Sequence, residues 1–187
     1  MTMRRAKRYT VQSFKEKEQT GNDPYSMRGA PKGVLECPEC HAMYYRKRWV
    51  LPGASGDGRA AQSSGKKAGK AAQPPQPYLC PACRKLRDRY PEGFVSIYWP
   101  NWVTYQTEVL NLIHNEEARA REDNPLARIM NIRTRPDGID IETTTEKMAQ
   151  RIGQRLRKAF HGDVQYKWSH KDKLARIDWK GPVKVTM

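Results

Sequence analysis

Cys37-Pro38-Glu39-Cys40 and Cys80-Pro81-Ala82-Cys83 contain all four cysteines of this chain. Two Cys-x-x-Cys pairs supply four thiolates, the closed tetrahedral ligand set of structural Zn²⁺ sites. Such a set leaves no coordination position open for a substrate. We therefore expect one structural zinc ion that folds the N-terminal half. Its predicted ligands are Cys37, Cys40, Cys80 and Cys83.

Two other interpretations of the cysteines are open. Cys37-x-x-Cys40-His41 matches the attachment pattern of c-type haem, but no export segment is visible and the second pair would be left unexplained. A thioredoxin-like redox pair would require a βαβ pattern around it, and neither pair has one. The sequence favours structural zinc over both.

The predicted zinc module covers residues 34–90. Its two cysteine pairs are separated by 39 residues, of which the 26 from Pro52 to Pro77 include no aliphatic side chain larger than Ala. Without that segment 13 residues remain, the spacing of a zinc ribbon or treble clef. We therefore predict a disordered insert at 52–77. Residues 84–90 are expected to form a short basic helix that has Cys83 in its first turn and ends at Pro91.

Residues 91–187 are predicted to form a small two-layer α+β domain. Phe94–Trp99 has the composition of a strand, and a helix is expected over 104–121, with Val109 and Ile113 on its apolar side and Glu116 on its wet side. Strands are expected within 126–135, at 139–143, and at two later segments ending near Trp168 and Trp179.

The strongest helical pattern follows Thr143. Met148, Ile152, Leu156 and Phe160 recur every four residues, opposite a face that includes Arg151 and Arg155. Thr143 and Glu146 match a capping box that would begin this helix. The resulting order, hairpin–helix–hairpin, predicts an antiparallel sheet crossed by one helix.

The chain has 187 residues and a formal net charge of +15. The charge is uneven, with 19 Lys and Arg against 7 Asp and Glu in residues 1–90, and 16 against 13 in residues 91–187. An excess of positive charge attracts polyanions, so the N-terminal half is the expected contact region. Residues 1–33 are predicted to be a basic, flexible extension.

The candidate nucleic-acid contacts are basic residues near the metal, together with one aromatic residue that could stack on a base. They are Arg4, Arg5, Lys7, Arg8, Tyr45, Arg46, Lys47, Arg48, Arg84, Lys85, Arg87 and Arg89. The alternative is that the aromatic residues pack over the metal while the charges are only solvated. The basic face of the helix over residues 147–158 is open to the same two interpretations.

No catalytic motif is present. The sequence lacks a P-loop, Gly-x-Ser-x-Gly or His-Glu-x-x-His motif, and its acidic residues form no pair typical of acid–base chemistry. We therefore expect no enzyme activity and no small-molecule substrate. No apolar run is long enough to cross a membrane and no secretory signal is visible, so a cytoplasmic location is expected.

Several motifs resemble a family of small bacterial zinc-binding proteins. They are the two cysteine pairs, Asn115–Arg121, Asn124–Ile129 and Thr143–Gly153. More distantly, zinc knuckles followed by an α+β unit are similar to the N-terminal half of the large-ribosomal-subunit export adaptor of archaea and eukaryotes. The resemblance implies binding to the large ribosomal subunit, with the four cysteines as metal ligands.

Charge, metal site and resemblance together favour a non-enzymatic zinc protein that binds ribosomal RNA, as an assembly, stability or hibernation-type factor. One alternative is a DNA-binding, transcription-associated zinc protein, although residues 84–90 are short for a recognition helix. The other is a protein–protein adaptor that binds a partner through the α+β domain.

Overall fold

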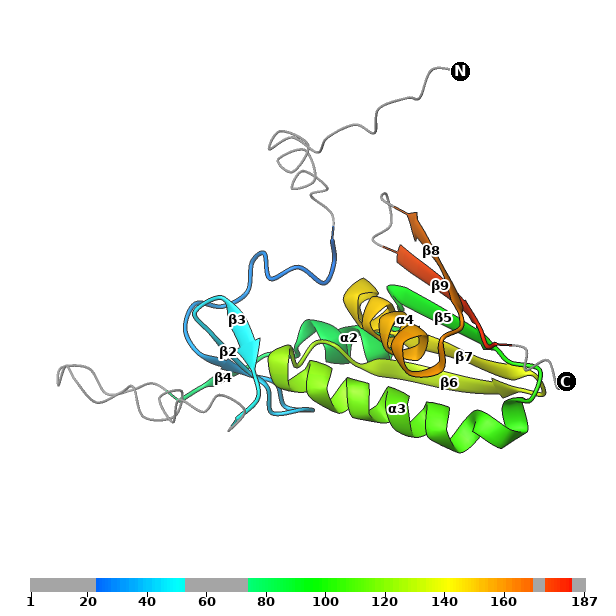
Figure 1. The fold of residues 1–187 in the computed structure, drawn as a ribbon. Coiled ribbons are helices and arrows are strands. Elements are labelled where there is room, and N and C mark those ends of the chain that lie inside the picture. The colour runs from blue at the N-terminus through cyan, green and yellow to red at the C-terminus, as the bar shows by residue number, and fades with distance from the viewer. Residues whose placement is uncertain (1–22, 53–73, 170–173, 183–187) are drawn as a thin grey trace, which may run out of the picture.

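The computed structural model describes residues 23–52, 74–169 and 174–182. The predicted contacts Arg4, Arg5, Lys7 and Arg8 lie outside these ranges, as do residues 53–73 of the predicted insert. The described chain forms a small module at one end of a larger α+β domain (Figure 1).

The N-terminal module combines four short strands with one helix. Its strands are β1 (Leu35–Glu36), β2 (Met43–Tyr45), β3 (Arg48–Val50) and β4 (Gln76–Pro77), and its helix is α2 (Pro81–Asp88). The sheet order is β3-β2-β1-β4, with β1 antiparallel to β2 and parallel to β4. Gln76 and Pro77, which the sequence assigned to the loop, therefore form a strand.

The α+β domain contains a five-stranded sheet and two long helices. They are β5 (Gly93–Tyr98), α3 (Trp102–Asp123), β6 (Ile129–Arg135), β7 (Gly138–Thr143), α4 (Glu146–Phe160), β8 (Asp163–Ser169) and β9 (Leu174–Lys180). The predicted α+β class is confirmed. The predicted antiparallel sheet is wrong, because the order is β6-β7-β5-β9-β8 and β5 pairs parallel with β9.

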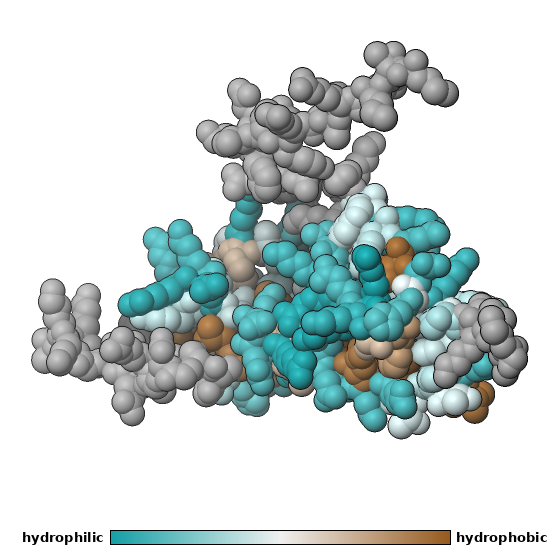
Figure 2. All heavy atoms as spheres, in the orientation of Figure 1, coloured by the Kyte–Doolittle hydropathy of each residue, from teal (hydrophilic) through white to brown (hydrophobic). Residues whose placement is uncertain are grey.

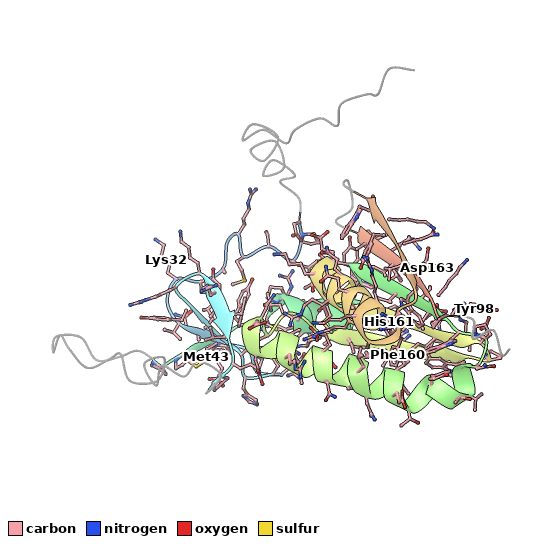
Figure 3. All side chains as sticks on the ribbon, in the orientation of Figure 1. Lys32, Met43, Tyr98, Phe160, His161 and Asp163 are labelled. Atoms are coloured by element: carbon pink, nitrogen blue, oxygen red, sulfur yellow. The ribbon has the colours of Figure 1, made fainter. Side chains whose placement is uncertain are left out.

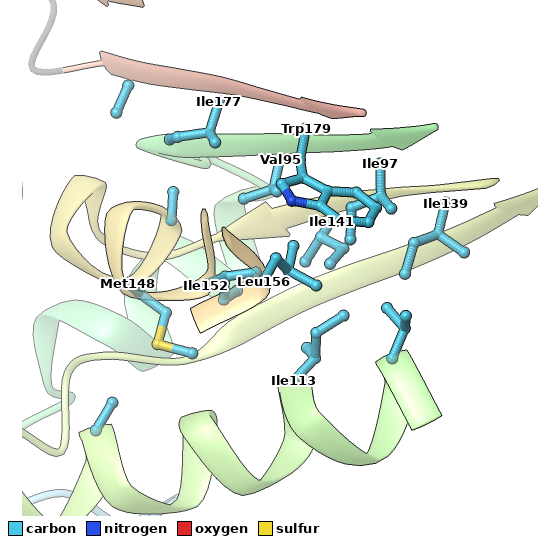
Figure 4. Packing of buried hydrophobic residues seen from close by; sticks show 14 of the residues in the cluster. Val95, Ile97, Ile113, Ile139, Ile141, Met148, Ile152, Leu156, Ile177 and Trp179 are labelled. Atoms are coloured by element: carbon cyan, nitrogen blue, oxygen red, sulfur yellow. The ribbon is translucent and has the colours of Figure 1, made fainter. Parts of the chain in front are cut away.

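The hydrophobic core lies between one face of this sheet and the two helices. Val95, Ile97, Ile139 and Ile177 are fully or almost fully buried. These sheet residues pack against Ile113 of α3 and against Met148, Ile152 and Leu156 of α4 (Figure 4). Two helices, and not the single predicted one, therefore cover this face.

Glu116 of α3 links this helix to α4 through two ion pairs. The sequence placed it on the wet side of its helix, but only 3% of it is exposed. Its carboxylate accepts from Arg151 Nε and Arg155 Nε, both at 2.7 Å. The expectation for Glu116 is wrong because the hydrophobic pattern of α3 cannot reveal that two arginines of α4 meet this carboxylate.

Tyr25 holds the end of the predicted flexible extension onto α2. It is 9% exposed, and its hydroxyl donates to Asp88 Oδ2 at 3.0 Å. Its ring also packs on Tyr90, with centroids 5.2 Å apart. Tyr25, which lies in the predicted extension, is thus packed against the end of α2.

The side of the molecule drawn in Figure 2 is mainly hydrophilic, with isolated apolar residues. Large exposed hydrophobic side chains among the described residues are Tyr90, Tyr98, Val103 and Trp168. None of the described helices combines the length and apolarity needed to cross a bilayer.

The N-cap of α4 is Thr145. Its side-chain oxygen accepts from the Met148 backbone N–H at 3.2 Å. The predicted cap, Thr143, is instead the last residue of β7, and its hydroxyl donates to the Thr145 carbonyl at 2.9 Å. Pairing of Thr143 with Gly93 keeps it in the sheet.

Replacing Thr145 by Ala is expected to destabilise the domain by about 1 kcal/mol, because one backbone donor at the start of α4 loses its acceptor. The thermal midpoint of this domain should fall by about 4–8 °C. Thr145→Ser keeps the hydroxyl and should stay near the wild type. Equal losses in the two variants would show that the methyl group, and not the cap, stabilises this position.

Candidate metal centre

The first cysteine pair lies in a tight turn after β1. The His41 backbone N–H donates to the Cys37 carbonyl at 2.9 Å, and the Cys37 N–H donates to the Ala42 carbonyl at 2.9 Å. His41 has a positive φ of 58°, which reverses the chain directly after Cys40. The turn thereby brings the Cys37 and Cys40 side chains to the same point.

The second pair occupies the start of α2. Cys80 is the N-cap and its sulfur accepts from the Cys83 backbone N–H at 3.4 Å, while Pro81 takes the first helical position. Proline is favoured there because its missing N–H would have no helical partner. The unpaired N–H groups of a helix start favour negative charge, and that of Cys83 partly offsets the cost of burying a thiolate at Cys80.

The four sulfur atoms converge. The Sγ atoms of Cys37, Cys40, Cys80 and Cys83 all lie within 4.8 Å of one another, and Cys40 Sγ is 3.6 Å from Cys80 Sγ. A tetrahedral ion with metal–sulfur bonds of about 2.3 Å would separate its ligands by about 3.8 Å. All four cysteines are free of disulfides. The predicted ligands are therefore positioned to hold a metal ion.

The cluster is largely buried. Cys37, Cys80 and Cys83 are at most 2% exposed, whereas Cys40 is partly exposed. Ala42 and Trp49 complete the buried cluster around them. Four sulfur donors would fill the tetrahedral coordination of one metal ion.

The environments of the sulfurs differ. Burial alone would raise the pKa of Cys37. Nearby backbone N–H groups, foremost that of Cys80, outweigh burial and lower this pKa to about 7. Burial raises the pKa of Cys80 to about 12 and also raises that of Cys83. Without a metal, Cys80 and Cys83 therefore favour the neutral thiol, and binding of a cation would release their protons.

Arg128 supplies positive charge to the cluster from the α+β domain. It is 8% exposed, and its Nη1 donates to Cys83 Sγ at 3.4 Å while its Nε donates to the Pro125 carbonyl at 2.9 Å. Burial alone would lower the pKa of Arg128, but the nearby sulfurs, that of Cys40 foremost, raise it. Four thiolates around a divalent ion carry two negative charges, and Arg128 compensates one of them.

Arg128 was missed as a site residue. The available signal was one cation inside the otherwise apolar run 125–130. Burying an arginine without an anion costs several kcal/mol, so such a residue indicates a hidden negative partner. Nothing in the sequence indicated that this partner would be the cysteine cluster.

A second buried contact joins the module to the domain. Lys85 is 7% exposed, and its Nζ lies 2.6 Å from Glu92 Oε1 and donates to the Thr144 carbonyl at 3.0 Å. Thr144 Oγ1 in turn accepts from the Arg128 backbone N–H at 2.9 Å. Lys85 is therefore engaged inside the protein, and phosphate contact does not account for its position.

The predicted contacts Tyr45, Arg46, Lys47 and Arg48 lie together on the β2–β3 hairpin. Tyr45 pairs with Arg48, so Arg46 and Lys47 form a two-residue turn, and the Arg46 guanidinium lies 5.2 Å from the Tyr45 ring centroid. Arg46 and Lys47 have φ angles of 48° and 64° and are exposed. Hairpin turns of this length favour Asn-Gly, because only such residues take positive φ at little cost.

The remaining predicted cations lie on α2. Arg84 Nη2 donates to the Pro24 carbonyl at 2.6 Å, and Arg87 Nη2 lies 2.8 Å from Glu39 Oε1. Arg89 is exposed and ends the helix with a φ of 52°. Arg84 and Arg87 thus contact other parts of the module. Among the described residues, none forms a hydrogen bond or an ion pair with the Arg89 side chain.

Comparison of the chain with protein-family models, with curated proteins and with solved structures finds no match.

Proposed function

We propose that this chain is a non-enzymatic zinc protein that binds structured RNA, with ribosomal RNA of the large subunit as the favoured target. In the cell it would act as an assembly, stability or hibernation-type factor in the cytoplasm. Zinc would be held by the four cysteines in a ribbon- or treble-clef-like module and would have a structural role.

The chemistry of the donors favours zinc. Soft thiolates select zinc or iron–sulfur centres over magnesium and calcium, and a four-sulfur set suits tetrahedral Zn²⁺. Bound zinc would hold the Cys37–Cys40 turn against the start of α2. It would thereby fix the position of the β2–β3 hairpin, which follows that turn. Arg128 and the N-terminus of α2 would offset the charge of the four thiolates.

The observation that carries the proposal is the hairpin tip. Arg46 and Lys47 occupy two consecutive positive-φ positions that Asn-Gly would fill with less strain. Strain retained at an exposed turn indicates a use for the side chains themselves. Two adjacent exposed cations next to Tyr45, on a chain with net charge +15, suit contact with an RNA backbone.

The double variant Arg46→Asn with Lys47→Gly tests this use. Relief of the backbone strain should stabilise the protein by about 1 kcal/mol. Loss of two phosphate contacts should weaken binding to large-subunit RNA and lower the slope of log affinity against log salt by about 2. Filter binding at several salt concentrations and a thermal melt measure both effects.

A charge-matched control removes two cations from the exposed face of α4, as Lys147→Gln with Arg157→Gln. It should change the salt slope much less than the hairpin variant. The proposal is wrong if the two double variants weaken RNA binding equally, since net charge alone would then explain the affinity.

Sedimentation in cell extracts decides between RNA and the alternatives. The wild-type protein should travel with large subunits in a sucrose gradient and be released by ribonuclease or by high salt. Partners that survive ribonuclease would support the protein adaptor instead. Affinity for duplex DNA equal to that for ribosomal RNA would support the transcription-associated alternative.

A further inference from the structure

The five-stranded sheet has a second face, opposite the one that α3 and α4 cover. Along β5, Val95 and Ile97 point into the core, so the alternate residues Phe94, Ser96 and Tyr98 belong to the opposite face. Tyr98 is 43% exposed. The strand at the centre of the sheet thus presents two aromatic rings away from the core.

The strand register places one cation beside each ring. Phe94 is paired with Arg176 of β9, whose guanidinium carbon lies 5.0 Å from the ring centroid, and with Glu142 of β7 on its other side. Tyr98 is paired with Lys180 on one side and with Gly138, which has no side chain, on the other. One flank of the Tyr98 ring is therefore left without a cross-strand side chain.

Two acids of this face are paired with cations. Asp178 Oδ2 accepts from Lys167 Nζ at 2.9 Å, and Asp140 Oδ2 lies 3.3 Å from Arg135 Nε. Arg176 and Lys180 are exposed, as is Arg133. With Asp178 and Asp140 paired, the cations Arg133, Arg176 and Lys180 remain for an approaching ligand, against the two further acids of this face, Glu142 and Asp163.

A groove of about 550 Å³ borders Phe94 where the end of α2 meets the sheet. Its lining includes Leu86, Arg89, Phe94, Asn131, Arg133 and Glu142. The volume is in the range that admits a ligand of nucleotide size. Arg89 and Arg133 outnumber the one acid, which makes the groove suited to a phosphate beside an aromatic ring.

We infer that this face, defined by Phe94, Tyr98, Arg176, Arg89 and Arg133, binds an unpaired segment of RNA. Aromatic rings stack on any base, and neighbouring arginines hold the backbone phosphates. Phe94 and Tyr98 are four residues apart on one strand, about 13 Å, so each ring serves a different base.

Single-stranded RNA fits this face better than duplex does. In a duplex the bases stack on each other and cannot lie on a protein ring, whereas unpaired bases can. Figure 3 shows Tyr98 at the end of the domain remote from the cysteine module, which contains Met43. An RNA strand along β5 would thus run away from the module. The inference rests on the proposed RNA binding and adds a second surface to it.

The test measures fluorescence anisotropy of a labelled ten-nucleotide oligouridine with the full chain. Phe94→Leu combined with Tyr98→Leu keeps apolar bulk but removes both rings, and should weaken binding at least tenfold. Tyr98→Leu alone should weaken oligouridine binding about tenfold. Because Tyr98 is exposed, this single variant is expected to fold even if the double variant does not. Trp168→Leu removes an equally exposed aromatic, 44% against 43%, and should leave affinity unchanged.

The outcomes separate this inference from the proposed function. Loss of oligouridine binding in the β5 variants, with the Trp168 variant intact, supports the face. Unchanged oligouridine affinity in the β5 variants, equal loss in the Trp168 variant, or no binding by the wild type overturns it. In those cases the proposed function still stands if the hairpin variant loses large-subunit RNA. If this face binds a protein and not RNA, the β5 variants should bind oligouridine as tightly as the wild type.

Discussion

Replacing Cys80 and Cys83 together by Ser is expected to release the metal and unfold the module formed by β1–β4 and α2. The strands of this module are two or three residues long, and its buried cluster consists largely of the cysteines themselves. Structural zinc contributes about 10–16 kcal/mol to the folding of comparable modules. Without it, so few buried residues cannot offset the entropy of ordering the chain.

Metal content and limited proteolysis measure this result. The double variant should carry no zinc and be cut within the module, while the α+β domain keeps its own core. A variant without metal that retained the far-UV spectrum and thermal midpoint of the wild type would contradict the expectation.

His41→Ala is the matched control. His41 directly follows Cys40, but its side chain is 70% exposed and its Nδ1 lies 3.2 Å from Glu36 Oε1. We expect this variant to keep zinc and proteolytic resistance. Loss of metal in it would mean that the ligand set includes the histidine.

Replacing Arg128 by Met is expected to weaken metal binding about 10- to 100-fold. The side chain is almost fully buried, and its removal leaves the thiolates without the guanidinium that donates to Cys83 and leaves the Pro125 carbonyl without its donor. Loss of one partner from a buried charge pair destabilises a protein by about 3–5 kcal/mol. Competition with a zinc chelator and thermal melting measure the two effects.

Two variants accompany this experiment. Arg128→Lys keeps the positive charge but lacks the guanidinium group that donates to both Cys83 and Pro125. Its metal affinity should therefore lie between that of Arg128→Met and that of the wild type. Arg133→Met removes an exposed arginine of β6, the strand that begins directly after Arg128, and should have little effect. If Arg128→Met held zinc within twofold of the wild type, the role given to Arg128 would be wrong.

The sequence predicted what is encoded by local spacing. The two cysteine pairs converge as expected, because a closed thiolate site imposes a recognisable pattern on its ligands. The helix from Glu146 to Phe160 is present with Met148, Ile152 and Leu156 buried, because one continuous apolar stripe allows no other packing.

Features set by distant partners were not predicted. Whether Thr143 or Thr145 caps α4 depends on where β7 stops pairing with β5, and a run of three threonines does not reveal it. The parallel pairing of β5 with β9 joins segments about eighty residues apart, and no local pattern specifies it. The burial of Glu116, Lys85 and Arg128 depends on charges supplied by other elements.

Elemental analysis of the gently purified, untagged chain tests the central claim most directly. Four converging thiolates, compensated by Arg128, should retain one zinc ion per chain, and all four sulfurs should react with a thiol reagent only after a chelator is added. A chain with no stoichiometric metal, or one whose cysteines are joined in disulfides, would contradict this account of the module and of the RNA-binding hairpin it supports.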